Sequence, residues 1–288
     1  MVDDENATDW LFPLPEKQPE EKSLLYSIKR PLWTANKSAL IERYLRTFVF
    51  ITHHGTYIDL FTGPQQPKQL DTWAAKRVIE IEPKWLRHFY LFEKHPNRIE
   101  QIEELKRQNI DRHIEAFPGD CNVRIHELLG RNDIREKEAT FCLLDQRTFQ
   151  CHWSTVKALA TYKKEGNKIE LFYFFPKAWY ARAIAGIRNT EILKQWWGRD
   201  DWRRVVLWPA MKCVTEMEER FRNELGYKSS RAFPIYKDAQ GRSIMYWMIH
   251  ATDHHLAPAE MMRAYNAVGL DLPPETAEQL TLLYPSES

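Results

Sequence analysis

The chain has 288 residues, 43% of them hydrophobic, and its 41 basic and 40 acidic side chains leave a formal charge of +1. This composition predicts one large globular domain, and the balanced charge excludes a global field that would attract nucleic acid or an anionic membrane. No apolar run approaches the roughly 20 residues that span a bilayer, and the acidic start is unlike a signal peptide, so we expect a cytoplasmic protein.

The sequence predicts three parts along the chain. Residues 1–22 are rich in Asp, Glu and Pro, which is typical of a partly disordered tail. Residues 23–270 are expected to form one α/β domain, within which 184–225 make a helical, tryptophan-rich insertion. Residues 271–288 contain prolines and acids and are expected to form a second tail.

Short apolar runs alternate with helical patterns between residues 37 and 175. Helical spacing predicts a helix over 37–49, and the apolar runs predict five strands, over 56–59, 89–93, 114–117, 139–144 and 169–175. A helix is expected after the second strand, with Asn97 as its cap, and another after the fourth strand. Strands that alternate with helices predict a doubly wound, mostly parallel sheet with helices on both faces.

The end of the domain has a different pattern. Residues 231–236 and 243–249 flank a glycine-containing turn, which predicts an antiparallel hairpin that closes the far edge of the sheet. A final helix is expected near 259–268.

Acidic residues stand at the ends of the predicted strands. Asp59, Glu93 and Asp145 each terminate an apolar run, and Asp120 follows the third strand by a tight turn. Ligands of open α/β sheets bind beyond the carboxyl ends of the strands, so we expect these acids to line one pocket. Thr62 and Gly63, after the first strand, are expected to line it too.

Each acid has a ligand-binding interpretation and a structural alternative. Glu93 is placed to accept both hydroxyls of a ribose, or it is a solvated loop acid paired with Lys94. Asp120 would accept the amino group of an adenine, or it caps a turn. Asp145 would contact a substrate or methionine moiety, or it is a loop acid whose charge is compensated by Arg147.

The order of these motifs resembles the seven-stranded fold of S-adenosylmethionine-dependent methyltransferases and, more closely, the three-Cys-motif partner family of bacterial and phage proteins. The similar segments are, in chain order, Tyr57 to Pro64, Phe92 to Pro96, Leu144-Asp145, Phe174 to Pro176 with Arg182, Leu225 to Tyr227, and Ala251 to His254. The resemblance implies a mostly parallel seven-stranded sheet of methyltransferase type, with the C-terminal antiparallel hairpin and the Trp-rich helical insertion.

The resemblance also implies a cofactor, a reaction and a partner. S-adenosylmethionine would be bound by Asp59, Thr62, Gly63, Glu93 and Asp120. Its methyl group would pass to an acceptor that the sequence does not identify, with Asp145 or His254 as the base. The implied partner is a protein with three cysteines that resemble a radical-type iron–sulfur site.

The chain departs from the family pattern at two places. Gln65 replaces a glycine that would let the backbone approach a ligand closely. Residues 146–148 replace a Pro-aromatic-Gly turn, and Arg147 brings a cation to the position of the sulfonium. These departures favour an alternative: a catalytically degenerate partner subunit, a pseudoenzyme that acts through protein or nucleic-acid binding.

Histidines suggest a third function, a metal-dependent nuclease. Two candidates, His53 and His54, lie at the first predicted strand. The others cluster after the predicted hairpin: His250, Asp253, His254 and His255. No glutamate follows His250 as it does in helical zinc motifs, so we interpret the histidines as structural and expect no metal.

Three further patterns bear on which classes of protein and site the sequence supports. The four cysteines are scattered, which argues against zinc-ribbon, iron–sulfur and disulfide frameworks. No P-loop and no nucleophile elbow is present. The 11 tryptophans, several beside arginines, would suit stacking on single-stranded nucleic acid, but we favour a core or a subunit interface.

Overall fold

The computed structural model describes residues 32–33, 36–64, 72–176, 190–205, 207–237 and 243–285. Several predicted features lie outside the described residues: the N-terminal tail over 1–22, Gln65, Arg182, the start of the helical insertion at 184–189, and most of the hairpin turn.

One sheet organises the described chain, with the strand order β1-β7-β8-β6-β5-β2-β3-β4. The strands are β1 (Leu32–Trp33), β2 (Gly55–Asp59), β3 (Leu86–Glu93), β4 (His113–Pro118), β5 (Thr140–Leu144), β6 (Glu170–Phe175), β7 (Ser229–Tyr236) and β8 (Ile244–Thr252). Strand β8 is antiparallel to both of its neighbours, and the other pairs are parallel. Apart from the two-residue β1, this is the predicted seven-stranded sheet of methyltransferase type with its C-terminal hairpin.

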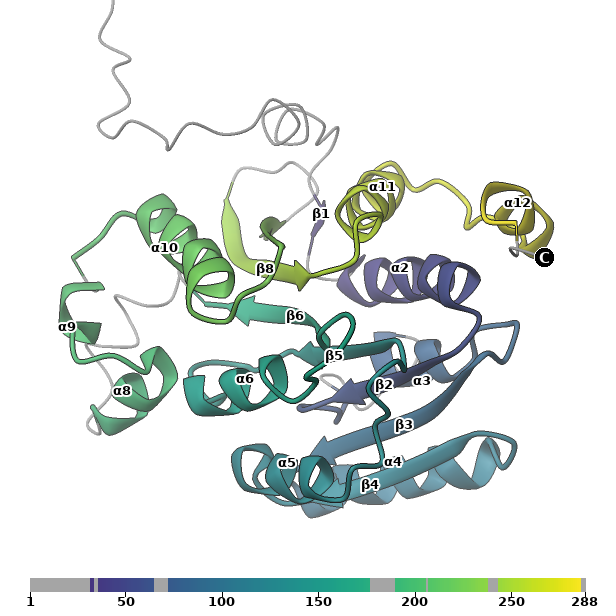
Figure 1. Ribbon diagram of the computed structural model, residues 1–288, viewed down its shortest axis with the longest axis horizontal. Coiled ribbons are helices and arrows are strands. Elements are labelled where there is room, and N and C mark those ends of the chain that lie inside the picture. Colours follow the sequence, from purple (N-terminus) through teal and green to yellow (C-terminus); the bar gives the residue numbers. More distant parts are fainter. Residues whose placement is uncertain are drawn as a thin grey trace, which may run out of the picture.

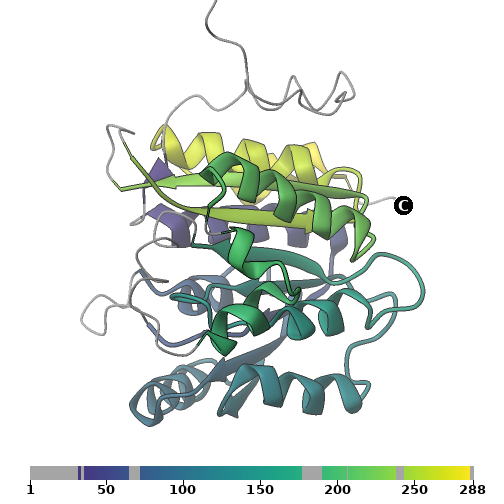
Figure 2. The same cartoon turned by 90° about the vertical axis from the view of Figure 1, so that its left-hand side faces the viewer.

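The helices form a layer on each face of the sheet (Figures 1 and 2). Helices α5, α6, α8 and α10 pack on one face, and α2, α3, α4, α11 and α12 pack on the other. Figure 2 looks onto one of these layers, with the green helices in front of the strands, and α10 contacts β7 and β8 of the hairpin. The helices are α2 (Lys37–Thr52), α3 (Ala74–Ile79), α4 (Pro96–Gln108), α5 (Cys121–Gly130), α6 (Trp153–Ala160), α8 (Glu191–Trp197), α9 (Trp202–Val205), α10 (Ala210–Asn223), α11 (Ala257–Gly269) and α12 (Ala277–Leu283).

The apolar runs of the sequence are explained by burial on both faces. Every residue of β2, β5 and β6 is buried. Neighbouring residues of a strand point to opposite faces, so Tyr57 packs into the core under α2, whereas Ile58 packs into the core under α5 and α6. Strands sandwiched in this way need apolar side chains at successive positions.

Two helix ends differ from the sequence prediction. The cap of α4 is His95 and not Asn97, because Pro96 occupies the first turn, where its fixed φ suits a helix and its missing N–H costs nothing. The segment expected as a tail over 271–288 contains α12, whose start is fixed by a capping box between Thr276 and Gln279. Leu280 of α12 is buried in the core that α2 covers.

None of the helices in the described residues is long and apolar enough to cross a membrane.

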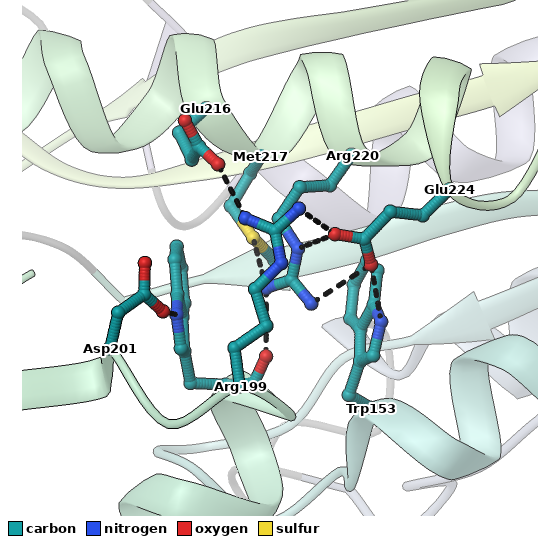
Figure 3. A network of polar contacts seen from close by, with 8 residues as sticks. Trp153, Arg199, Asp201, Glu216, Met217, Arg220 and Glu224 are labelled. Carbon is teal, nitrogen blue, oxygen red and sulfur yellow. Dashed lines mark hydrogen bonds and ion pairs between the residues drawn. The ribbon is translucent and has the colours of Figure 1, made fainter.

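The described part of the tryptophan-rich insertion is fixed by a buried arginine (Figure 3). The Arg220 guanidinium lies 3.9 Å from the ring centroid of Trp153 and 4.6 Å from that of Trp197. It donates to the carboxylate of Glu224 at 2.9 and 3.2 Å and to the Trp197 carbonyl at 2.7 Å. Trp153 Nε1 donates to the same carboxylate at 3.0 Å. One side chain thus joins α6, α8 and α10.

We predict that Arg220→Ala lowers the free energy of unfolding by about 3 kcal/mol, because it removes the hydrogen bonds and leaves space between two indole rings. Urea unfolding followed by tryptophan fluorescence measures the change. Arg203→Ala is the matched control: Arg203 also lies over an indole, that of Trp202, but on the surface. It should cost less than about 1 kcal/mol, and equal losses would contradict the role given to Arg220.

Candidate functional site

The carboxyl ends of the parallel strands surround a cavity of about 400 Å³. Gly63 follows β2, Glu93 ends β3, Asp120 follows β4, and Asp145 follows β5, and all four line this cavity. Four of the seven predicted site residues therefore meet at one place. The neighbours that complete the wall include Phe61, Phe149 and Ile192, so the cavity has both apolar and charged surface.

Asp59 and Thr62 build the turn under the cavity. Asp59 is 2% exposed, accepts a hydrogen bond from the Tyr57 hydroxyl at 3.2 Å and another from the Phe61 amide at 3.0 Å. The Thr62 hydroxyl donates to the Asp59 carbonyl at 2.9 Å. Burial raises the pKa of Asp59 to about 7, and the nearby charge of Asp145 adds to the shift. Both residues fix the loop that carries Gly63.

Glu93 is held by the backbone around it. One oxygen accepts the amides of Lys94 and His95, each at 2.8 Å, and the other accepts the Gly63 amide at 2.9 Å. Arg98 lies 3.7 Å from this second oxygen. The alternative partner considered from the sequence, the side chain of Lys94, makes no ion pair with Glu93 in the described structure. Three of about four acceptor positions of the carboxylate are occupied, so a ribose that donates both hydroxyls to Glu93 has to displace one amide, such as that of Gly63.

Asp120 caps α5 and also faces the cavity. Its Oδ1 accepts the backbone amide of Asn122 at 2.9 Å and the side-chain amide at 2.8 Å. Asn122 in turn accepts the amide of His152 at 2.8 Å and donates to the Gln150 carbonyl at 2.8 Å. The cap predicted as the structural alternative is present, and it leaves Oδ2 without a hydrogen bond to any described residue.

Asp145 forms a buried ion pair with Lys37, with Nζ and Oδ2 2.5 Å apart. Arg147, the partner considered from the sequence, makes no ion pair with Asp145 among the described residues, although the two charges attract each other. Burial alone would lower the pKa of Lys37, but the attraction of Asp145 outweighs it and raises the pKa. One oxygen of the Asp145 carboxylate is therefore already engaged by the chain itself.

Gln146 replaces the rigid proline turn of the family pattern with side-chain hydrogen bonds. It is 1% exposed, accepts the Cys151 amide at 2.8 Å and donates to the Phe174 carbonyl at 3.1 Å. The turn after β5 is therefore fixed without proline, and Arg147 is held at the wall of the cavity.

His254 lies at the opposite end of the sheet, where the parallel strands begin. Because β8 runs antiparallel, its carboxyl end pairs with the beginning of β6, as Ala251 does with Leu171. His254 lines a separate cavity of about 440 Å³ with Glu170 and Thr252. Partial burial and the neighbouring His255 lower the pKa of His254. The structure does not bring the two candidate bases, Asp145 and His254, together.

The histidine cluster has structural contacts. His250 is 1% exposed, and its Nε2 lies 2.8 Å from Glu170. The same carboxylate accepts the hydroxyls of Tyr44 and Thr252. His254 and His255 stack on each other. Within the described ranges, no group of three or more His, Cys, Asp or Glu side chains could hold a metal ion.

Sequence reasoning missed Lys37, Arg98 and Asn122. Lys37 is 108 positions from its partner Asp145, and no local pattern signals that pairing. Arg98 and Asn122 could have been found by their positions on the first turns of the helices that follow β3 and β4, where side chains face the same edge as the strand ends.

Comparisons with known proteins add structural neighbours at low similarity. No protein-family model and no curated protein matches the sequence. TYW2 of M. jannaschii, solved in complex with AdoMet, shares 15% identity with a TM-score of 0.38 over 75% of each chain. A precorrin-6y C5,15-methyltransferase from Geobacter metallireducens shares 12% with a TM-score of 0.36, over 72% of this chain and 86% of that one. Trm5b from Pyrococcus abyssi shares 12% with a TM-score of 0.34, over 72% and 47%.

We predict that Gly63→Ala opens the hydrogen bond between Gly63 and Glu93. A methyl group at this position would overlap Glu93 Oε2 and Arg98 Cδ, so the carboxylate or the loop has to move. Loss of the buried hydrogen bond should lower the free energy of unfolding by about 1–3 kcal/mol, measured by urea unfolding.

Gly130→Ala is the control for this substitution. Gly130 ends α5, and a methyl group there meets nothing within 4 Å. Because alanine favours a helix, this variant should match the wild type or gain up to about 1 kcal/mol. A Gly63→Ala protein as stable as Gly130→Ala would show that the hydrogen bond between Gly63 and Glu93 contributes nothing to the free energy of unfolding.

Proposed function

We propose that this protein binds S-adenosylmethionine in the cavity at the carboxyl edge of its methyltransferase-type sheet and transfers its methyl group to a nucleophile. The observation that carries the proposal is the meeting of Gly63, Glu93, Asp120 and Asp145 around one cavity. Its volume of about 400 Å³ lies within the range of small-molecule sites.

The residues at this edge fit a nucleoside cofactor. Asp120 has an oxygen that is not used by its cap and suits an adenine amino group. Glu93 would accept the ribose hydroxyls after release of the Gly63 amide, and Gly63 leaves room for close approach because it has no side chain. When bound, the cofactor supplies an electrophilic methyl group. The chain's own part is to bind and orient the two reactants.

The proposal extends to a partner. The order and spacing of the sequence motifs support membership of the three-Cys-motif partner family, and hence an iron–sulfur protein as the partner. Co-expression with an iron–sulfur protein that carries the three-cysteine motif, followed by size-exclusion chromatography, tests it: co-elution is expected, and separate elution contradicts it.

A second candidate function is the catalytically degenerate partner subunit. It is favoured by the contacts of the acids: Glu93 accepts three backbone amides, and Asp145 is paired with Lys37. If these contacts never open, the fold serves only as a binding surface.

Isothermal titration of the full chain with S-adenosylmethionine and S-adenosylhomocysteine separates the two functions. We predict one site per chain, and binding about tenfold weaker in Glu93→Gln, because a charged acceptor for the ribose is lost. Glu115→Gln is the matched control, since Glu115 pairs with Arg131 away from the cavity. Absence of heat with either ligand at micromolar sensitivity would sink the enzyme proposal and leave the degenerate subunit.

A further inference from the structure

The cavity at the carboxyl edge carries more positive charge than its acids suggest. Lys94, Arg98 and Arg147 line it together with Glu93, Asp120 and Asp145. Two of the three acids are already engaged within the chain, Glu93 by three backbone amides and Asp145 by Lys37. Lys37 is not part of the cavity wall, so on the wall itself Lys94, Arg98 and Arg147 face Glu93 and Asp120, which leaves one more cation than anion.

Arg147 is the cation that the described structure leaves for a ligand. Its backbone amide donates to Gln150 at 3.2 Å, whereas its guanidinium makes no hydrogen bond or ion pair with the described residues. Gln146, directly before it, fixes the turn on which it stands. The turn that carries Arg147 is thus fixed by the fold, while the side chain is exposed at the cavity and its donors are unused by the described residues.

Arg98 approaches the same space from α4. Its stem packs against Gly63, and its contact with Glu93 is long, at 3.7 Å. Arg98 and Arg147 line the same cavity. Partial burial and repulsion from Arg98 lower the pKa of Arg147, and the attraction of Glu93 and Asp145 opposes this shift. Two like charges held at one wall of a cavity favour an anion between them.

We propose that Arg98 and Arg147 together bind an anionic group, a carboxylate or a phosphate, on the nucleoside ligand of this cavity. The inference deepens the proposed function and rests on it, because it takes the same cavity as the nucleoside site. A guanidinium presents paired donors that match both groups. The source is either the amino-acid carboxylate of the cofactor or the phosphate of a nucleotide.

Titration calorimetry with two pairs of ligands tests the inference. S-adenosylhomocysteine is compared with 5′-methylthioadenosine, which lacks the amino-acid group, and adenosine 5′-monophosphate is compared with adenosine. In the wild type, at least one charged ligand should bind about tenfold or more tightly than its shortened partner. Arg147→Ala should abolish that difference and leave the affinity of the shortened ligand within about twofold.

Two further variants give the controls. Arg147→Lys keeps the charge but not the paired donors, so it should retain only part of the difference. Arg87→Ala removes an exposed arginine near the amino end of β3, away from the cavity, and should bind all four ligands like the wild type. Thermal melts of each variant establish that it is folded.

The outcomes separate this inference from the proposed function. Equal binding within both pairs in the wild type would overturn the inference while leaving the cofactor site intact. The same holds if Arg147→Ala weakens charged and shortened ligands alike. Arg147-dependent binding of adenosine 5′-monophosphate without binding of either S-adenosyl ligand would overturn the proposed cofactor and support the anion site. Failure of all four ligands to bind would overturn both.

Discussion

Three carboxylates lie buried side by side at the carboxyl ends of neighbouring strands, and the rest of this edge is arranged around their compensation. Burial of an uncompensated carboxylate costs several kcal/mol, so each acid needs donors, a cation or a proton. Glu93 takes three backbone amides, and Asp145 takes the ammonium of Lys37. Asp59 accepts two hydrogen bonds, and burial raises its pKa to about 7, so that a proton can neutralise it.

These contacts also position distant parts of the chain. The pair between Lys37 and Asp145 holds the start of α2 against the end of β5. Glu93 joins the loop after β2 to the first turn of α4. The cavity is therefore a product of the same charge compensation that stabilises the edge. A ligand that enters the cavity competes with hydrogen bonds and ion pairs that the protein already makes to itself. If the ligand wins, the cavity is a cofactor site; if it does not, the protein is the catalytically degenerate subunit.

The sequence predicts what is local. Continuous apolar runs mark β2, β5 and β6 because both faces of these strands are buried, and the turn residues between 237 and 242 mark the hairpin. The positions of Asp59, Glu93, Asp120 and Asp145 at one edge follow from parallel strand direction alone. The two-residue strand β1 is too short to produce a pattern.

Long-range features could not be predicted in the same way. The partner of Asp145 comes from a helix 108 positions earlier, and its choice over Arg147 depends on tertiary packing. His254 belongs to a motif near the end of the chain, but the antiparallel direction of β8 carries it to the opposite edge. The donors to Glu93 were missed because backbone amides leave no mark in a sequence.

The central claim is that ligand binds at the carboxyl edge and not at the amino edge, where the second cavity lies beside Glu170 and His254. Hydrogen–deuterium exchange of the full chain, with and without saturating S-adenosylhomocysteine, tests this directly. The account predicts slower exchange at 60–63, 93–95, 119–122 and 145–150, and unchanged exchange at 166–170 and 252–257. Protection confined to the amino edge, or no protection at either edge, would contradict it.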